Sequence, residues 1–103
     1  MEKAADNNER RALSVLGAYY MNGFGVQQNL RRGFEIFRRG AEADDPICMF
    51  QLARCYESGA GTSANPKLMR EWYEKAAEAG NAGAAEWCKK NNVQFTPRAA
   101  APN

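Results

Sequence analysis

Apolar residues recur at helical spacing along most of the chain. Two stretches place small and aromatic residues three or four positions apart, which is the spacing of one helix face. The first stripe consists of Ala12, Leu16, Tyr19 and Tyr20, and the second of Cys48, Leu52, Cys55 and Tyr56. We expect each stripe to be the buried face of a helix. Two further helices are predicted from about Leu30 to Ala43 and from Pro66 to Ala79.

Boundary signals separate these helices. Asn65-Pro66 and Asp45-Pro46 each combine an N-cap residue with a proline at the first helical position. The segments Gly23-Phe24-Gly25 and Gly59-Ala60-Gly61 provide the backbone freedom that a sharp reversal needs. A phosphate-binding loop would follow a strand and open a helix, whereas here a predicted helix precedes each glycine pair. We therefore interpret both segments as structural turns.

The two stripes belong to a repeat with an offset of 36 residues, because Leu16 and Leu52 are 36 positions apart. The same offset, without gaps, relates Tyr20 to Tyr56, Gly23 to Gly59, Gly25 to Gly61, Asn29 to Asn65, Glu35 to Glu71 and Phe37 to Tyr73. A third copy begins at Ala84 and stops after one helix near Asn91. Repeated helix pairs of this length predict a stacked solenoid.

The predicted fold is therefore all-α, an α/α superhelix of two helix-pair repeats with a C-terminal half repeat acting as a cap. We expect an N-terminal extension at residues 1–9, repeats at 10–45 and 46–81, the capping half repeat at 82–95, and a disordered tail at 96–103. A length of 103 residues allows one domain with one shared core.

The repeat motif resembles the Sel-like repeat, a relative of the tetratricopeptide repeat. The resemblance covers about residues 12–90. The residues on which it rests are Leu16-Gly17-x-x-Tyr20-x-x-Gly23-x-Gly25-Val26, then Phe34-x-x-Phe37 and Ala41-Glu42-Ala43. The resemblance implies an α/α repeat fold. Some relatives resemble enzymes or bind bacterial cell-wall fragments, which leaves a hydrolase acting on such fragments as a distant alternative.

Composition narrows the location and the partner. The net charge is +2 and mean hydropathy is −0.64, as in an ordinary globular protein. No apolar stretch approaches the roughly 20 residues of a membrane-spanning helix. The N-terminus lacks the basic start and apolar segment of a signal peptide, so we expect a cytoplasmic protein, or a secreted or periplasmic one if a leader was removed.

The chain contains few of the residue types that catalysis or metal binding commonly uses. It contains no histidine and three cysteines, Cys48, Cys55 and Cys88. On one helix Cys48 and Cys55 would be separated by roughly 10 Å of rise, beyond the Cα distance of about 7 Å that a disulfide spans. We therefore expect reduced, partly buried thiols with no disulfide, metal or cofactor. No nucleophile motif is present, and we do not expect an enzyme.

A partner protein is the predicted ligand. In a solenoid the first helices of the repeats line a concave surface, where partners bind. The predicted contacts lie opposite the apolar stripes: Ser14, Ala18, Phe50, Gln51, Arg54, Glu57, Trp87 and Lys90. Aromatic and arginine side chains carry much of the energy of such interfaces. Alternatively, Phe50 packs between repeats and Trp87 seals the core. We expect a small adaptor, an inhibitor or an immunity-type protein.

Two further features leave alternatives open. Arg31, Arg32, Arg38 and Arg39 form either a solvated helix face or a basic patch for an acidic protein. Neighbouring acidic residues and the lack of interleaved aromatics disfavour nucleic acid. Because about three repeats are usually needed for a stable solenoid, the chain is alternatively a self-associating module or a fragment of a longer array. Trp87, Val93 and Phe95 would then cap a neighbour, so both monomer and homodimer remain open.

Overall fold

The computed structural model describes residues 7–98, with side chains from residue 11 onward. This range forms α-helices and no strands, which confirms the all-α prediction. The helices are α1 (Asn7–Asn22), α2 (Leu30–Glu42), α3 (Pro46–Ser58), α4 (Pro66–Glu78) and α5 (Ala82–Lys90). The two second helices, α2 and α4, begin at the predicted residues and end one residue early. None of the helices in the described range has the length and apolar character needed to cross a membrane.

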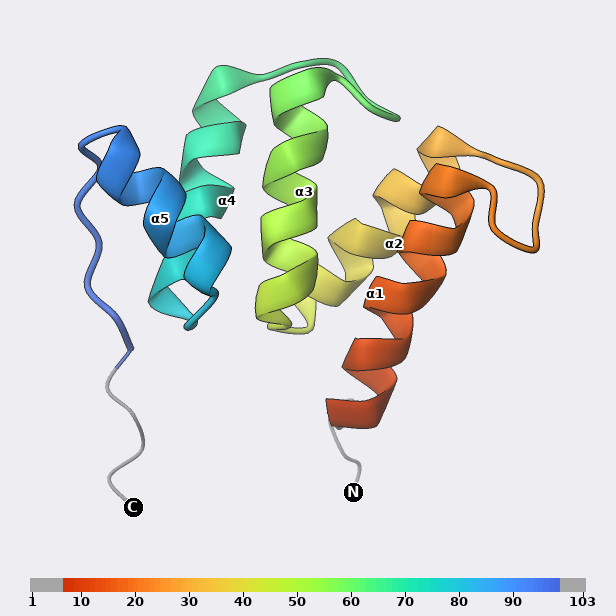
Figure 1. The fold of residues 1–103 in the computed structure, drawn as a ribbon, viewed down its shortest axis with the longest axis horizontal. Coiled ribbons are helices and arrows are strands. Elements are labelled where there is room, and N and C mark those ends of the chain that lie inside the picture. The colour runs from red at the N-terminus through yellow and green to blue at the C-terminus, as the bar shows by residue number, and fades with distance from the viewer. Residues whose placement is uncertain (1–6, 99–103) are drawn as a thin grey trace.

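The helices stack in chain order. Helix α2 packs against both α1 and α3, and α4 packs against both α3 and α5. Figure 1 shows α1 and α2 at one end of the resulting row and α4 and α5 at the other. This arrangement is the predicted α/α superhelix of two helix pairs and a half repeat. In a solenoid each repeat unit contacts the units next to it in the row and no others.

Helices α2 to α5 all begin at a side-chain cap. In each case a side-chain oxygen accepts a hydrogen bond from the backbone N–H three residues later. The caps are Asn29 at 3.0 Å, Asp45 at 3.2 Å, Asn65 at 3.1 Å and Asn81 at 2.8 Å. A cap of this kind contributes about 1 kcal/mol. Because Asn29 aligns with Asn65, and Asp45 with Asn81, the repeat fixes where its helices begin.

The glycine pairs form turns, as predicted. All four glycines have a positive φ, between 72° and 79°. Gly61 also lies against the start of α2, where an added Cβ would overlap the Leu30 carbonyl group and come within 2.8 Å of Phe34 Cβ. The equivalent Gly25 has nothing within 4 Å of such a Cβ. The second turn is therefore clamped against the preceding repeat, whereas the first turn is open.

The core is centred on α3. Cys48, Leu52 and Ala53 are fully buried there. Close approach of α2 to α3 requires Gly40, because a Cβ at this position would overlap the Cys48 side chain. Burying one leucine side chain contributes about 1.5–3 kcal/mol. The second predicted stripe is therefore the buried interface between the repeats.

The first predicted stripe is not a core face, and that prediction was wrong. Ala12 is exposed, and Leu16 and Tyr19 are 40% and 44% exposed. Helix α1 instead turns Gly17 toward α2, where a Cβ would come within 2.6 Å of the Phe37 ring. The second stripe is buried because α2 packs on it, whereas no helix of the described range packs on the equivalent face of α1.

The chain continues in contact with the fold beyond α5. Val93 is buried and Phe95 is half-buried against the core. The Arg98 backbone N–H donates to the Glu78 carbonyl at 2.8 Å, and its guanidinium donates two hydrogen bonds, at 2.7 and 2.9 Å, to the Asp44 carboxylate. Ordered contacts therefore reach Arg98, past the boundary predicted at Phe95.

Both predicted terminal segments lie partly outside the described residues. Helix α1 begins at Asn7, within the extension predicted at residues 1–9. Residues 1–6 and 99–103 are not described. The residues proposed to cap a neighbour, Trp87, Val93 and Phe95, pack on their own chain, and self-association through them stays a prediction.

Candidate functional site

A cavity of about 340 Å³ lies between α1 and α3. Four of the predicted contact residues line it, namely Ala18 on α1 and Gln51, Arg54 and Glu57 on α3. The buried Phe37 ring of α2 contributes its apolar base. The other lining residues are Met21, Asn22, Cys55, Ser58 and Ala60. The first helices of the two repeats therefore enclose a pocket with an apolar base and a polar rim.

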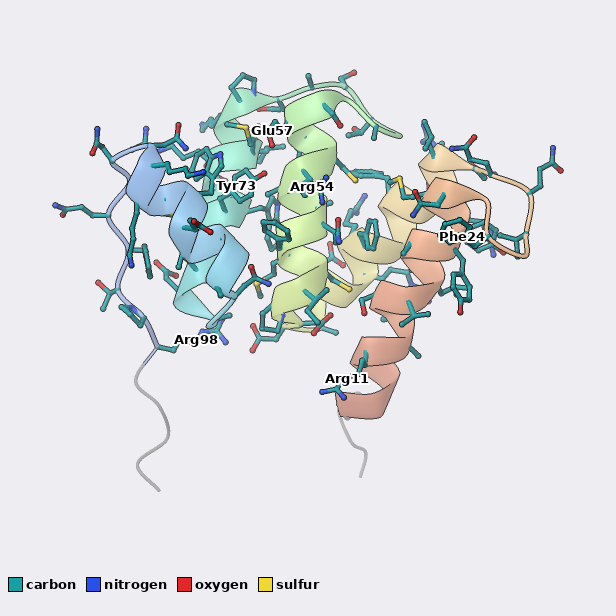
Figure 2. The ribbon with its side chains drawn as sticks, viewed as in Figure 1. Arg11, Phe24, Arg54, Glu57, Tyr73 and Arg98 are labelled. Carbon is teal, nitrogen blue, oxygen red and sulfur yellow. The ribbon has the colours of Figure 1, made fainter. Side chains whose placement is uncertain are left out.

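Arg54 supplies a positive charge at this cavity. Its side chain is exposed on α3 (Figure 2). Its guanidinium carbon lies 5.9 Å from the Phe50 ring centroid, within the range of a cation–π contact. Among residues 11–98 it forms no ion pair with an acidic side chain. The charge is therefore accessible to an external carboxylate.

An aromatic cluster fills the space beside Arg54, where α3, α4 and α5 meet. Phe50 packs edge-on against Tyr73 with centroids 5.8 Å apart, and Trp87 stacks on Tyr73 at 4.2 Å. A Cβ at Gly83 would come within 3.1 Å of the Phe50 ring. Phe50 and Trp87 are both half-buried against the core. The structure thus favours the packing alternative for these two residues.

Tyr73 links this cluster to the cavity. Its hydroxyl donates a hydrogen bond of 2.7 Å to Glu57 Oε1. Burial first, and then the hydrogen bond and negative charge of Glu57, raise the pKa of Tyr73 well above its ordinary value. The phenol therefore stays protonated and holds the Glu57 carboxylate at the cavity rim. Sequence reasoning missed this role, although a tyrosine aligned with the buried Phe37 signals a hydroxyl that needs a partner.

The structure does not bring the remaining predicted contacts to the cavity. Ser14 is buried, and its Oγ donates to the Arg11 carbonyl oxygen at 2.7 Å. It lies one helical turn before Ala18, the first residue of α1 that lines the cavity. Lys90 is exposed at the end of α5 and does not line the cavity. The cavity is therefore a feature of α1 and α3, without α5.

The four arginines proposed as a basic patch all lie exposed on α2. Three of them make local contacts within the fold. These are Arg31 with Glu35 at 3.4 Å, Arg38 with Glu42 at 3.3 Å, and Arg32 over the Tyr20 ring at 5.3 Å. Exposed ion pairs at i and i+4 contribute only a few tenths of a kcal/mol. The arrangement favours the interpretation that these arginines form a solvated helix face. Arg39, the fourth of them, is exposed next to Arg38.

The three cysteines are buried free thiols. Burial raises the pKa of each, and that of Cys55 reaches about 11 from an ordinary 9.0 in spite of the opposing charge of Arg54. The thiols are therefore neutral at physiological pH and are poor nucleophiles. Within the described range no group of three or more histidine, cysteine or acidic residues is placed to hold a metal ion.

Stability is expected to fall between pH 9 and pH 11. The raised pKa of Cys55 favours the folded state while its thiol is protonated, and this contribution is lost as pH rises above 9.0 toward about 11. A shift of two units corresponds to about 2–3 kcal/mol. Urea unfolding at pH 8 and pH 11 measures the loss. Cys55→Ala should lose less stability over this range than the native chain, and equal losses would contradict the assignment.

Both repeats of the chain match the model of one protein family. The model of the Sel1 repeat matches residues 10–45 and 46–81. The chain belongs to the Sel1 repeat family. Sel1 repeat proteins generally mediate protein–protein interactions. The cavity between α1 and α3 is formed by the first helices of the two matched repeats.

Solved structures of other Sel1-type proteins are similar to this one. A Sel1 repeat protein from Oxalobacter formigenes is 37% identical with a TM-score of 0.76, over 79% of this chain and 61% of that one. Cysteine rich protein B from Helicobacter pylori is 25% identical with a TM-score of 0.74, over 78% of this chain and 60% of that one. A protective antigen present in uropathogenic Escherichia coli strains is 27% identical with a TM-score of 0.73. The match covers 84% of this chain and 19% of that one.

A sequence relative is Chitin synthase regulatory factor 3 from Schizosaccharomyces pombe. It is 27% identical over 73 residues, which are 70% of this chain and 8% of the relative. The chain thus spans less than two thirds of the length of each of these relatives.

Proposed function

We propose that this chain is a small adaptor or inhibitor-type protein that binds a segment of a partner protein in the cavity between α1 and α3. The observation that carries the proposal is Arg54. It is an exposed cation at the rim of a cavity with an apolar base, and it forms no ion pair within the described residues. An arginine so placed matches a carboxylate on the partner.

The lining of the cavity defines the segment that fits. Phe37 and Met21 provide an apolar surface for one hydrophobic side chain. Asn22, Gln51 and Ser58 carry polar groups that can pair with the backbone of an extended segment. The segment would place its acidic residue beside Arg54 and away from the Glu57 carboxylate. The opposite charges of these two side chains give the bound segment one preferred direction.

The relatives support a role through binding. Sel1 repeat proteins generally mediate protein–protein interactions, and the S. pombe relative is named as a regulatory factor. The buried, neutral thiols of this chain supply no activated nucleophile. We therefore propose that it acts by occupying or presenting a site on its partner.

A random-peptide library displayed on phage tests the proposal. Selection on the native chain should enrich peptides that carry an acidic residue near an apolar one. Synthetic versions should bind Arg54→Glu at least about tenfold more weakly, because a charge-assisted hydrogen bond contributes about 1.5–3 kcal/mol. Arg31→Glu is the matched control, since Arg31 lies on α2 outside the cavity. Equal affinity for Arg54→Glu, or no enrichment of such peptides, would contradict the proposal.

A further inference from the structure

One face of α1 is apolar and uncovered by the described chain. We define the α1 outer face as Arg11, Ala12, Val15, Leu16 and Tyr19, which line a shallow hollow of about 490 Å³. Val15, Leu16 and Tyr19 are each between 40% and 45% exposed. Figure 2 marks Arg11 at the lower end of this helix. A run of large apolar side chains at this exposure is typical of a contact surface.

The aligned residues of the second repeat indicate what kind of surface this face is. Ala12, Leu16 and Tyr19 align with Cys48, Leu52 and Cys55, which are buried on α3 against α2. The α1 outer face therefore has the composition of a helix–helix interface without the helix that covers it. The open space at Gly25, in contrast to Gly61, continues the uncovered surface to the adjoining turn.

A second copy of the chain cannot cover this face by stacking head to tail. In the described structure such stacking would need a second helix with a free inner face. However, α3 already covers α2, and α5 already covers α4. Val93 and Phe95 pack against the core after α5. A second copy can instead offer its own α1 outer face, and such a pairing is two-fold.

The α1 outer face is complementary to itself in an antiparallel pair. With the two-fold axis between positions 15 and 16, Ala12 lies opposite Tyr19 of the second copy, because 12 and 19 are equally far from that midpoint. Val15 likewise lies opposite Leu16. A small residue thus meets a large one at each end, as close packing requires. Each half of the pair makes the same contacts, as in an isologous interface.

The helix dipole favours the position of Arg11 in this pair. Arg11 would approach the C-terminal end of the opposing α1, where the helix dipole is negative. That last turn carries no basic residue. In this register Arg11 lies opposite position 20 of the second copy, so the two Arg11 side chains are about 14 Å apart along the helix axis. Arg32, which lies over the Tyr20 ring, is a second positive side chain near each of these ends. No like charges meet across the apolar centre.

We propose that two copies of this chain pair through their α1 outer faces. None of the residues lining the cavity belongs to this face, so the dimer would present two binding cavities. A helix of 16 residues is about 24 Å long, and one such contact buries less than the roughly 800 Å² per partner of a standard interface. Association is therefore expected in the micromolar range.

Mass measurements on the full chain test the pairing. Light scattering or sedimentation from about 1 to 500 µM should show a rise from 11.4 kDa to twice that mass. Leu16→Glu should remain monomeric across this range. Leu30→Glu is the matched control, because Leu30 is 43% exposed at the first position of α2, where a carboxylate is compatible with the helix. It should associate like the native chain.

Three results would overturn the proposal. A constant monomer mass would mean that some other molecule covers the face. Unchanged association of Leu16→Glu would place the interface elsewhere, and masses above the dimer would indicate head-to-tail growth. The antiparallel register has its own test, since Ala12→Cys combined with Tyr19→Cys should form intermolecular disulfides under mild oxidation. The native thiols are buried and should not compete. Absence of that cross-link in a dimer would reject the register.

Discussion

Leu52→Ala is expected to lower the free energy of unfolding by about 3 kcal/mol, within the usual range of 2–5 kcal/mol for a buried leucine. Leu52 is fully buried on α3, between the two repeats. Its truncation removes apolar contacts and leaves a cavity that neighbouring helices cannot easily fill. Urea unfolding followed by circular dichroism gives the difference, with low temperature keeping the variant folded in the absence of denaturant.

Leu16→Ala is the matched control at the aligned position of the first repeat. Leu16 is 40% exposed and has no described helix packed on it. At submicromolar concentration, where the proposed dimer dissociates, we expect a loss below about 1 kcal/mol. Similar losses for the two variants would show that α1 is covered like α3. That result would contradict the open face on which the dimer proposal rests.

Gly61→Ala is the second substitution with a large expected effect, a loss of about 3 kcal/mol. Gly61 has φ of 75°, a conformation that costs an L-residue roughly 1–2 kcal/mol. The new Cβ would also overlap the Leu30 carbonyl group and press on Phe34, so the turn or α2 must shift. Overpacking of this kind costs about a further 1–3 kcal/mol.

Gly25→Ala separates these two causes. Its φ of 72° gives the same backbone strain, but no atom lies within 4 Å of the added Cβ. We expect a loss of about 1 kcal/mol, measured by the same unfolding experiment. If Gly25→Ala were as harmful as Gly61→Ala, backbone strain alone would explain both. The close contact between the second turn and α2 would then have no energetic role.

Most of the fold follows from the repeat. The 36-residue offset aligns the cap residues Asn29 and Asn65, the turn glycines and the buried aromatic positions, so local chemistry and long-range packing agree. Helix starts were predictable because an Asn or Asp cap accepts a hydrogen bond from a backbone N–H three residues later. The pocket could be predicted in outline, since Ala18, Gln51, Arg54 and Glu57 share one side of the first helices.

The remaining features depend on which neighbour each face meets. Leu16 and Leu52 are the same residue at the same repeat position, so periodicity assigned both to the core. Within residues 7–98, a further helix packs on Leu52 but not on the equivalent face at Leu16. The bond between Tyr73 and Glu57 joins residues of different helices. The ion pair between Arg98 and Asp44 joins positions 54 residues apart. Spacing along the chain carries no signal for contacts of this kind.

The most direct test of the central claim is a map of where a bound peptide lies. The ¹⁵N-labelled chain, titrated with an acidic peptide enriched in the selection, should show its largest amide shift changes around Ala18, Gln51 and Arg54. Small changes are expected on the exposed arginine face of α2. If the largest changes fell on that face or on the α1 outer face, with the cavity residues unaffected, the cavity between α1 and α3 would not be the binding site.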